Sequence, residues 1–513
     1  MLSLRADFAL RRSKKPGIRP LNSPCRRSKG QIVAERMLRF VNTDREPPAK
    51  RSSLARKADF QEIYAELAQA KAAEQASRCS QCGVPFCQSH CPLQNNIPDW
   101  LRLTAEGRLQ EAYETATATN LMPEICGRIC PQDRLCEGVC VIEQSGHGTV
   151  TIGAIEKYLT ETAWAEGWVA PIRALRERAE HVGIIGAGPA GLAAAEVLRR
   201  KGYKVTVYDR YDRAGGLMIY GIPNFKLEKD VVARRVARLE EGGVTFVLNC
   251  EVGRNITFDA LRSKHEALLV ATGVYKARDL GVPQPASKGV LAAMEFLTAS
   301  NKVGLGDAVE AFASGELDAK GRRVVVIGGG DTSMDCVRTA VRQGAKSVTC
   351  LYRRDRANMP GSLTEVKNAE EEGVKFEWLA APKAILGDAK KLKAVRAVKM
   401  RLGAPDASGR QAPEEAPGTE FDLGADLVIK ALGFDPEDLP VLWDESYLKT
   451  SRWGTLRVNE RNYETSIPGV FAAGDIVRGA SLVVWAIKEG RDAAEGIHAH
   501  LKERAASAAV AAQ

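Results

Sequence analysis

Eight of the twelve cysteines gather in two short runs, where closely spaced thiols can act as metal ligands. The first run has the spacing C-x2-C-x4-C-x3-C and consists of Cys79, Cys82, Cys87 and Cys91, followed by Pro92. The second has the spacing C-x3-C-x5-C-x3-C and consists of Cys126, Cys130, Cys136 and Cys140, with Pro131 after its second cysteine. In a 513-residue chain that lacks a secretory signal, such clusters favour metal binding over disulfides.

Irregular runs in which a cysteine precedes proline are typical of the loops that hold 4Fe–4S clusters in two-cluster ferredoxins. In those loops the cysteine before proline binds the other cluster, so Cys91 and Cys130 need not share a cluster with their nearest predecessors. Structural zinc is the alternative, although a two-zinc ribbon usually has two C-x2-C pairs. His90 is interpreted as a neighbour of a ligand. The isolated cysteines are interpreted as plain thiols: Cys25, Cys250, Cys336 and Cys350.

A strand–turn–helix pattern near residue 186 has the glycine spacing of a dinucleotide-binding turn. Gly186 permits the tight turn, Gly188 lets the backbone approach a pyrophosphate, and Gly191 lets the helix pack on the strand. The second strand ends in Asp209, 23 residues after Gly186. Because a carboxylate there accepts hydrogen bonds from a ribose diol, this unit is predicted to bind FAD or another 2′-hydroxyl dinucleotide.

A second unit of the same kind follows, with Gly328, Gly330, Asp331 and Thr332 in its turn and Ser333 at the third glycine position. Its second strand ends in two arginines, Arg353 and Arg354. A guanidinium binds a 2′-phosphate that a carboxylate would repel, so this unit is predicted to bind NADPH. The alternative interpretation of the two arginines is a solvated strand end.

Residues near the C-terminus are expected to complete the first unit. Asp475, which follows Gly474, is placed to bind a flavin ribityl hydroxyl, and a helix starting near Ser481 would direct its positive end at the flavin pyrimidine. Two short strands that end at Val270–Gly273 and Lys430–Gly433 are expected to be the crossings between two nested domains.

The fold class is therefore α/β, with a helical N-terminal iron–sulfur domain followed by two nested, doubly wound, Rossmann-like domains. Apolar residues at helical spacing predict helices at 55–77 and after Ile97. The expected domains are a basic, disordered extension (1–36), a helical domain for two 4Fe–4S clusters (37–175), an FAD domain (176–290 and 435–513) and an NADPH domain (295–430).

Charge is concentrated at the start of the chain. Residues 1–60 carry 16 Lys or Arg and 5 Asp or Glu, whereas the whole chain has a net charge of only +9. We find no basic face on a folded element that would indicate nucleic-acid binding. No segment has the ~20 apolar residues of a membrane span, so we expect a soluble, cytoplasmic protein. Met37 is a plausible alternative start.

Three motifs carry a close family resemblance over residues 37–500: Arg78–Cys87, Gly215–Lys226 and Gly329–Thr332. The chain resembles the small (β) subunit of bacterial glutamate synthase, a module shared with the N-terminal half of dihydropyrimidine dehydrogenase. The resemblance implies that Gly216 and Leu217 bind the flavin. It also implies one cluster on Cys79, Cys82, Cys87 and Cys140, and a second on Cys91, Cys130, Cys136 and Glu156. Cys126 competes with Glu156 for the fourth position, because carboxylate is a harder ligand than thiolate.

The resemblance also implies the reaction. NADPH would reduce FAD by hydride transfer, and the two 4Fe–4S clusters would carry single electrons onward; no proton-transferring catalytic residue is needed. Neither Met1 nor Met37 is followed by the cysteine of an amidotransferase. Glutamine and 2-oxoglutarate would therefore react on a large (α) subunit that carries FMN and makes two glutamates. The alternatives are a reductase subunit for another acceptor, such as a pyrimidine-reducing partner or ferredoxin, and a zinc-containing redox sensor.

Overall fold

The computed structural model describes residues 34–406 and 411–511. Most of the expected basic extension, including Met1 and Cys25, lies outside these described residues, whereas Met37 lies within them. Within the described ranges, none of the helices combines the length and apolar character that a bilayer span requires.

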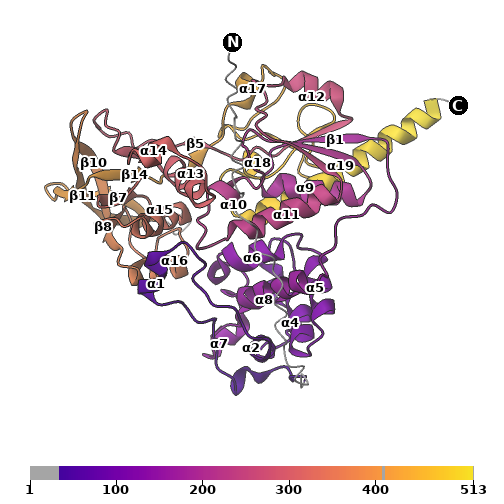
Figure 1. Ribbon diagram of the computed structural model, residues 1–513, viewed down its shortest axis with the longest axis horizontal. Coiled ribbons are helices and arrows are strands. Elements are labelled where there is room, and N and C mark those ends of the chain that lie inside the picture. Colours follow the sequence, from indigo (N-terminus) through magenta and orange to yellow (C-terminus); the bar gives the residue numbers. More distant parts are fainter. Residues whose placement is uncertain (1–33, 407–410, 512–513) are drawn as a thin grey trace, which may run out of the picture. The chain divides into compact units, whose positions relative to one another are not determined.

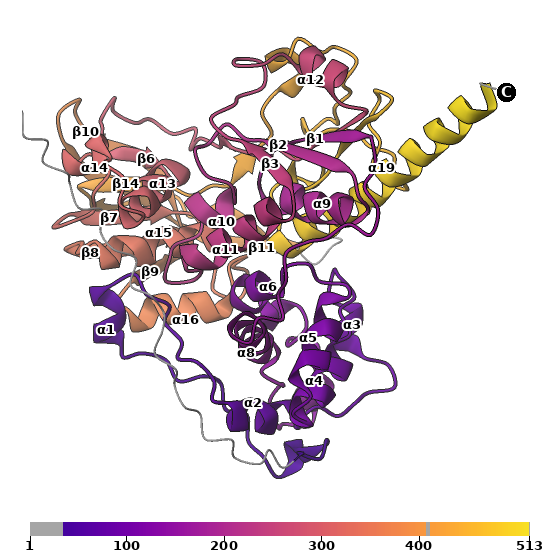
Figure 2. The ribbon, with the colours of Figure 1, turned by 45° about the vertical axis from the view of Figure 1, so that its right-hand side comes forward.

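The N-terminal domain is helical, as expected. Its core contains Trp100, which is fully buried and donates a hydrogen bond to the Asn95 side chain at 2.7 Å. Pro98 lies in the first turn of the Trp100 helix, where its missing N–H leaves no bond unmade. The helices of this domain are η1 (Arg39–Val41), α1 (Ser53–Ala58), α2 (Gln69–Ala76), α3 (Phe86–Ser89), α4 (Ile97–Ala105), α5 (Leu109–Thr117), α6 (Pro123–Ile129), η2 (Gln132–Arg134), α7 (Val141–Gln144) and α8 (Ile152–Ala165). Figure 2 shows α2, α3, α4, α5, α6 and α8 together, with α1 apart from them beside α16 (Leu363–Glu371).

The prediction of a helix at 55–77 is wrong, because the structure has two short helices there, α1 and α2, with a non-helical segment between them. The chain between α1 and α2 is extended and pairs with an earlier segment, because Arg51 N–H donates to Ile63 O and Ala65 N–H donates to Ala49 O, both at 2.9 Å. Asp59 accepts from the Arg51 guanidinium and from Gln61 N–H, which stabilises the turn after α1. Tertiary pairing here overrides the helical spacing of the apolar residues.

The first α/β domain is built on a five-stranded parallel sheet in the order β16-β4-β1-β2-β3. Its strands are buried on both faces, which accounts for their continuous apolar sequence. Helices α9 and α19 run side by side along the sheet (Figure 1). The strands are β1 (His181–Ile185), β2 (Lys204–Tyr208), β3 (Val244–Val247), β4 (Ala267–Val270) and β16 (Val470–Ala472); the helices are α9 (Pro189–Arg200), α10 (Leu217–Tyr220), α11 (Lys229–Glu241), α12 (Phe258–Lys264), α17 (Leu439–Leu442), α18 (Asp475–Arg478) and α19 (Val483–Ala511).

The second α/β domain is inserted in the first and repeats its plan, with a parallel sheet in the order β6-β14-β7-β8-β9. The short antiparallel pair of β5 (Lys276–Ala277) and β15 (Phe434–Asp435) joins the entering and leaving chains. The sheet begins at Val290, slightly before the expected residue 295. Its elements are β6 (Val290–Ala292), α13 (Ala293–Gly304), α14 (Glu310–Ala313), β7 (Arg323–Ile327), α15 (Asp331–Arg342), β8 (Ser347–Tyr352), α16 (Leu363–Glu371), β9 (Lys375–Trp378) and β14 (Leu427–Lys430).

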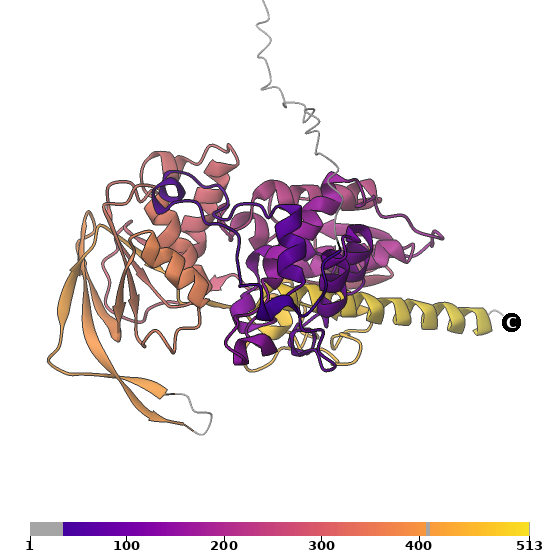
Figure 3. The same cartoon turned by 90° about the horizontal axis from the view of Figure 1, so that it is seen from below.

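An antiparallel sheet in the second domain was not expected. It consists of β10 (Ala380–Gly387), β11 (Leu392–Pro405), β12 (Gln411–Glu415) and β13 (Phe421–Gly424). Figure 3 shows β11 and β12 extending as a long hairpin. In β11, Val395 and Ala397 are buried on either side of the exposed Arg396, and such alternation is the signal that predicts a half-buried strand.

We expect Gly490→Ala to destabilise the protein by about 1–3 kcal/mol, because added volume at a close contact must shift backbone. A Cβ at Gly490 would lie 2.0 Å from Ala190 O, where α19 crosses α9. Gly304→Ala is the matched control, since a Cβ there meets no atom within 4 Å. Thermal unfolding of both variants tests the packing; equal midpoints would contradict it.

Candidate functional site

The first glycine turn is shaped by contacts that exclude side chains. Gly186 has φ 110°, and a Cβ there would lie 2.3 Å from Ala271 O. A Cβ at Gly191 would lie 2.0 Å from Gly186 O. Gly188 is different: it caps α9, and a Cβ there would meet nothing nearer than the Gly216 Cα at 4.0 Å. The space before the α9 N-terminus therefore fits a pyrophosphate.

Asp209 lies at the end of β2 beside this turn. Its carboxylate accepts hydrogen bonds from Ala187 N–H at 2.7 Å and Tyr211 N–H at 2.8 Å, while burial raises its pKa. A carboxylate has further lone pairs, so ribose hydroxyls can still donate to it. The adjacent pocket is lined by aromatic side chains, including Tyr275, and the buried Thr272 hydroxyl has no partner among the described residues. These features fit the adenosine half of FAD.

The expected C-terminal contributors meet the same helix end. A Cβ at Gly474 would lie 3.0 Å from the Ala190 Cβ, and Gly216, which precedes Leu217 of α10, lies against Gly188. Burial raises the pKa of Asp475 to about 7, although the Ser481 backbone donates a hydrogen bond to it. Helix α19 begins two residues after Ser481. The structure thus brings these predicted flavin residues together around the α9 N-terminus.

The second glycine turn repeats the first almost contact for contact. Gly328 has φ 148°, and a Cβ there would lie 2.2 Å from Ala431 O. Gly330 caps α15, and a Cβ there would meet nothing within 4 Å, which again leaves space for a pyrophosphate. Asp331 accepts a hydrogen bond from Ser362 N–H at 2.9 Å. Thr332 follows in the first turn of α15 and is partly exposed.

The two arginines after β8 have free guanidinium groups. Neither the Arg353 nor the Arg354 guanidinium makes a hydrogen bond or ion pair with another described residue, and the Arg354 Nε is buried without a partner, although the Arg354 carbonyl accepts a hydrogen bond from Leu379 N–H at 3.0 Å. Arg356, two residues later, is paired with Glu370 at 2.8 Å. Unpaired guanidiniums at the end of the second strand fit the 2′-phosphate of NADPH.

The thiols form two groups. In addition to burial, negative charge on Cys82 and Cys140 contributes to raising the pKa values of Cys79 and Cys87, so these four thiols lie near one another. Burial raises the pKa of Cys136 and Cys87 also contributes to raising it, so the two groups adjoin. Burial raises the pKa of Cys79 to about 11 and that of Cys87 to about 12. Buried thiols of this kind are deprotonated only when bound cations compensate the charge.

The second group couples Cys91, Cys130, Cys136 and Cys126 with Glu156. Glu156 lies on α8, accepts a hydrogen bond from the Asn120 amide at 3.0 Å, and burial raises its pKa to about 8. The Cys126 thiol donates to the carbonyl oxygen of the same Asn120 side chain at 3.7 Å. Glu156 and Cys126 therefore both face this group.

Among the described residues, no three His, Cys, Asp or Glu side chains converge as the ligands of one ion do. A single zinc needs its sulfurs about 2.3 Å from one point. A 4Fe–4S cluster instead takes one thiolate at each of four irons, so its donors surround a volume. Each of the two groups contains at least the four candidate donors that such a cluster takes.

Arg78 is a site residue whose role the sequence did not reveal. Its guanidinium is fully buried and donates to the carbonyls of Thr43, His147 and Thr149 at 2.6–2.9 Å. Because Cys79 follows directly, these bonds fix the first thiol loop against two distant segments. In the sequence, only the position of Arg78 directly before the predicted ligand Cys79 indicated that it could matter to the site.

Comparisons with known proteins agree with this geometry. Residues 180–490 match the pyridine nucleotide-disulphide oxidoreductase family, and residues 56–168 match the family described as dihydropyrimidine dehydrogenase domain II, 4Fe-4S cluster. The chain is 64% identical over 483 residues to the glutamate synthase (NADPH) small chain of Azospirillum brasilense, covering 94% of this chain and 100% of that one. The small chain of Escherichia coli K12 is 46% identical, with coverages of 91% and 99%.

The fold also resembles a solved structure. Mycobacterium tuberculosis FprA in complex with NADPH is 20% identical, with a TM-score of 0.55 over 64% of this chain and 86% of that one. At this identity the likeness establishes the shared fold alone.

Replacing Arg353 and Arg354 with alanine should weaken the preference for NADPH over NADH by about tenfold to a hundredfold, the loss expected for charge-assisted hydrogen bonds. The measurement is the dissociation constant of each nucleotide. Arg356→Ala is the control, because that guanidinium is already paired. An unchanged preference in the double variant would refute the 2′-phosphate assignment.

Glu156→Gln and Cys126→Ser distinguish the two candidates for the fourth ligand of the second group. We expect Glu156→Gln to lower the iron content per chain, because an amide oxygen is a weaker ligand than a carboxylate, and Cys126→Ser to leave it unchanged. Iron analysis after anaerobic purification measures both. Loss of iron in Cys126→Ser alone would show that Cys126 is the ligand.

Proposed function

The chain belongs to the family of glutamate synthase small chains, and from that premise we propose that it is the electron-input subunit of an NADPH-dependent glutamate synthase. It oxidises NADPH by hydride transfer to FAD and passes single electrons through two 4Fe–4S clusters. The observation that carries the proposal is the pair of glycine turns, one followed by Asp209 and the other by Arg353 and Arg354, in a chain that also holds two groups of free thiols.

The chain's own residues bind and orient the reactants. The N-termini of α9 and α15 bind the two pyrophosphates, Asp209 holds the flavin ribose, and Arg353 with Arg354 holds the 2′-phosphate of NADPH. Asp475, at the start of α18, and the N-terminus of α19 would face the flavin. FAD, when bound, supplies the change from two-electron to one-electron chemistry. No side chain has to move a proton in the hydride step, so we assign no catalytic residue.

Two groups of side chains would hold the 4Fe–4S clusters. Cys79, Cys82, Cys87 and Cys140 suit one cluster. Cys91, Cys130, Cys136 and Glu156 suit the other. The clusters supply one-electron carriers.

The partner is a large subunit that carries FMN and the amidotransferase and makes two L-glutamate from L-glutamine and 2-oxoglutarate. The names of the relatives as small chains support such a partner. The loop between Cys82 and Cys87 exposes Val84 (68%) and Phe86 (46%), an apolar surface beside the first thiol group that suits a protein contact. All eleven cysteines in the described ranges are free thiols, which supports a reducing, cytoplasmic location.

The test of this function is reconstitution. The purified chain, mixed anaerobically with a separately purified large subunit, glutamine and 2-oxoglutarate, should form two glutamates for each NADPH consumed. The large subunit alone should not consume NADPH. If the chain reduces an artificial acceptor with NADPH but yields no glutamate with the large subunit, it serves another acceptor.

A further inference from the structure

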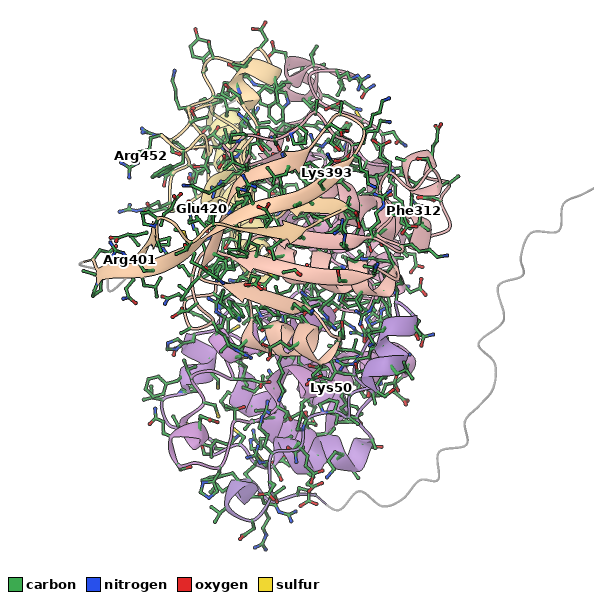
Figure 4. The ribbon with its side chains drawn as sticks, turned by 90° about the vertical axis from the view of Figure 1, so that its left-hand side faces the viewer. Lys50, Phe312, Lys393, Arg401, Glu420 and Arg452 are labelled. Atoms are coloured by element: carbon green, nitrogen blue, oxygen red, sulfur yellow. The ribbon has the colours of Figure 1, made fainter. Side chains whose placement is uncertain are left out.

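Helix α16 of the second α/β domain is held at both ends by the helical N-terminal domain. We call these contacts the α16 clamp: Asp133 and Arg134 at the N-terminal end of the helix, and Lys50, Ser53 and Arg56 at its C-terminal end. Helices α1 and α16 lie side by side in both Figure 1 and Figure 2. Figure 4 shows Lys50 where the violet helical domain meets the orange second domain.

At its N-terminal end, α16 takes its cap from another domain. Its own cap residue, Ser362, makes no side-chain bond to the helix backbone. Instead the Asp133 carboxylate accepts from Leu363 N–H at 3.2 Å and from the Ser362 hydroxyl at 3.2 Å. Arg134 donates to Pro360 O. A carboxylate at this position satisfies a free N–H and interacts favourably with the helix dipole.

At its C-terminal end, the clamp presents cations and a hydroxyl donor. Ser53 Oγ donates to Glu371 O at 2.6 Å, one of the carbonyls that the helix leaves free. Lys50 and Arg56 bind the Glu371 carboxylate at 3.1 and 2.8 Å. Asp133 at the N-terminal end and the two cations at the C-terminal end have the signs that the helix dipole favours, although Arg134 and the Glu371 carboxylate have the opposite signs.

The capped end of α16 also touches the second glycine turn. Ser362 N–H donates to the Asp331 carboxylate at 2.9 Å, and Gly361 N–H donates to Gly329 O at 2.9 Å. Asp331 directly follows Gly330, which caps the helix that faces the pyrophosphate space. One short segment, residues 360–363, therefore connects Asp133 to the nucleotide turn.

We propose that Asp133 is a positioning residue for NADPH: by capping α16 it fixes the 360–363 segment, and through Asp331 it fixes the turn that receives the pyrophosphate. This inference rests on the proposed binding of NADPH to the second domain. Asp133 lies between Cys130 and Cys136, so the loop that positions the nucleotide turn is also the loop that carries two of the second group of thiols. The proposed NADPH turn and the second group of thiols are thus joined through Asp133 and the 360–363 segment.

Asp133→Ala should raise the dissociation constant of NADP⁺ by about threefold to tenfold, the ratio that corresponds to one lost cap. The KM for NADPH should rise with it, while the limiting rate of flavin reduction changes little. Iron content per chain is measured alongside, to show that the thiol loop is intact. Glu143→Gln is the matched control, because Glu143 is an exposed carboxylate three residues from Cys140, and it should leave the affinity unchanged.

Ser362→Ala provides a second variant outside the thiol loop. It should weaken NADP⁺ binding by a smaller factor, and its effect should not add to that of Asp133→Ala, because both remove the same hydrogen bond. Wild-type affinity in an iron-replete Asp133→Ala protein, or in Ser362→Ala if Asp133→Ala loses iron, would overturn the inference. A wild-type chain that does not bind NADP⁺ would instead contradict the proposed function.

Discussion

The structure depends on two helix N-termini, those of α9 and α15, that must stand open to a phosphate. In both domains the first glycine of the turn packs against a carbonyl just after a neighbouring strand, at a distance that excludes a Cβ. Gly186 lies against Ala271 O, after β4, and Gly328 lies against Ala431 O, after β14. The second glycine leaves the space in front of the helix clear. The same turn therefore recurs twice, and the residue at the end of the following strand decides which dinucleotide each turn accepts.

The helical domain follows a second constraint, the cost of burying charge. Burial raises the pKa values of Cys79, Cys87, Cys91 and Glu156, so their charged forms need bound cations. The domain also contacts the second α/β domain through the hydrogen bonds and ion pairs of the α16 clamp. Under the proposals above, its fold would serve two purposes, surrounding the clusters and holding the nucleotide turn, and the 130–136 loop, whose Asp133 accepts hydrogen bonds from Ser362 and Leu363, would take part in both.

The features that the sequence predicted depend on residues close together in the chain, whereas the contacts that it missed join residues farther apart. The glycine turns were predictable, because a turn that requires positive φ or excludes a Cβ is specified by local residues. The roles of Asp209, Arg353 and Arg354 in binding the nucleotides stay predictions. The assignment of each cluster ligand stays a prediction. The extended segment after Asp59 was predicted wrongly, and the β10–β13 sheet was not predicted. The Asp133–Ser362 contact joins residues 229 positions apart, and no local pattern encodes it.

The central claim is that one chain carries electrons from NADPH to flavin and on to iron–sulfur clusters. The most direct test is a visible spectrum of the anaerobically purified chain before and after NADPH, with NADH as the control, alongside iron and zinc analysis. The account predicts rapid flavin bleaching by NADPH but not NADH, and about eight irons per chain. Zinc in place of iron, or no response to either nucleotide, would contradict it.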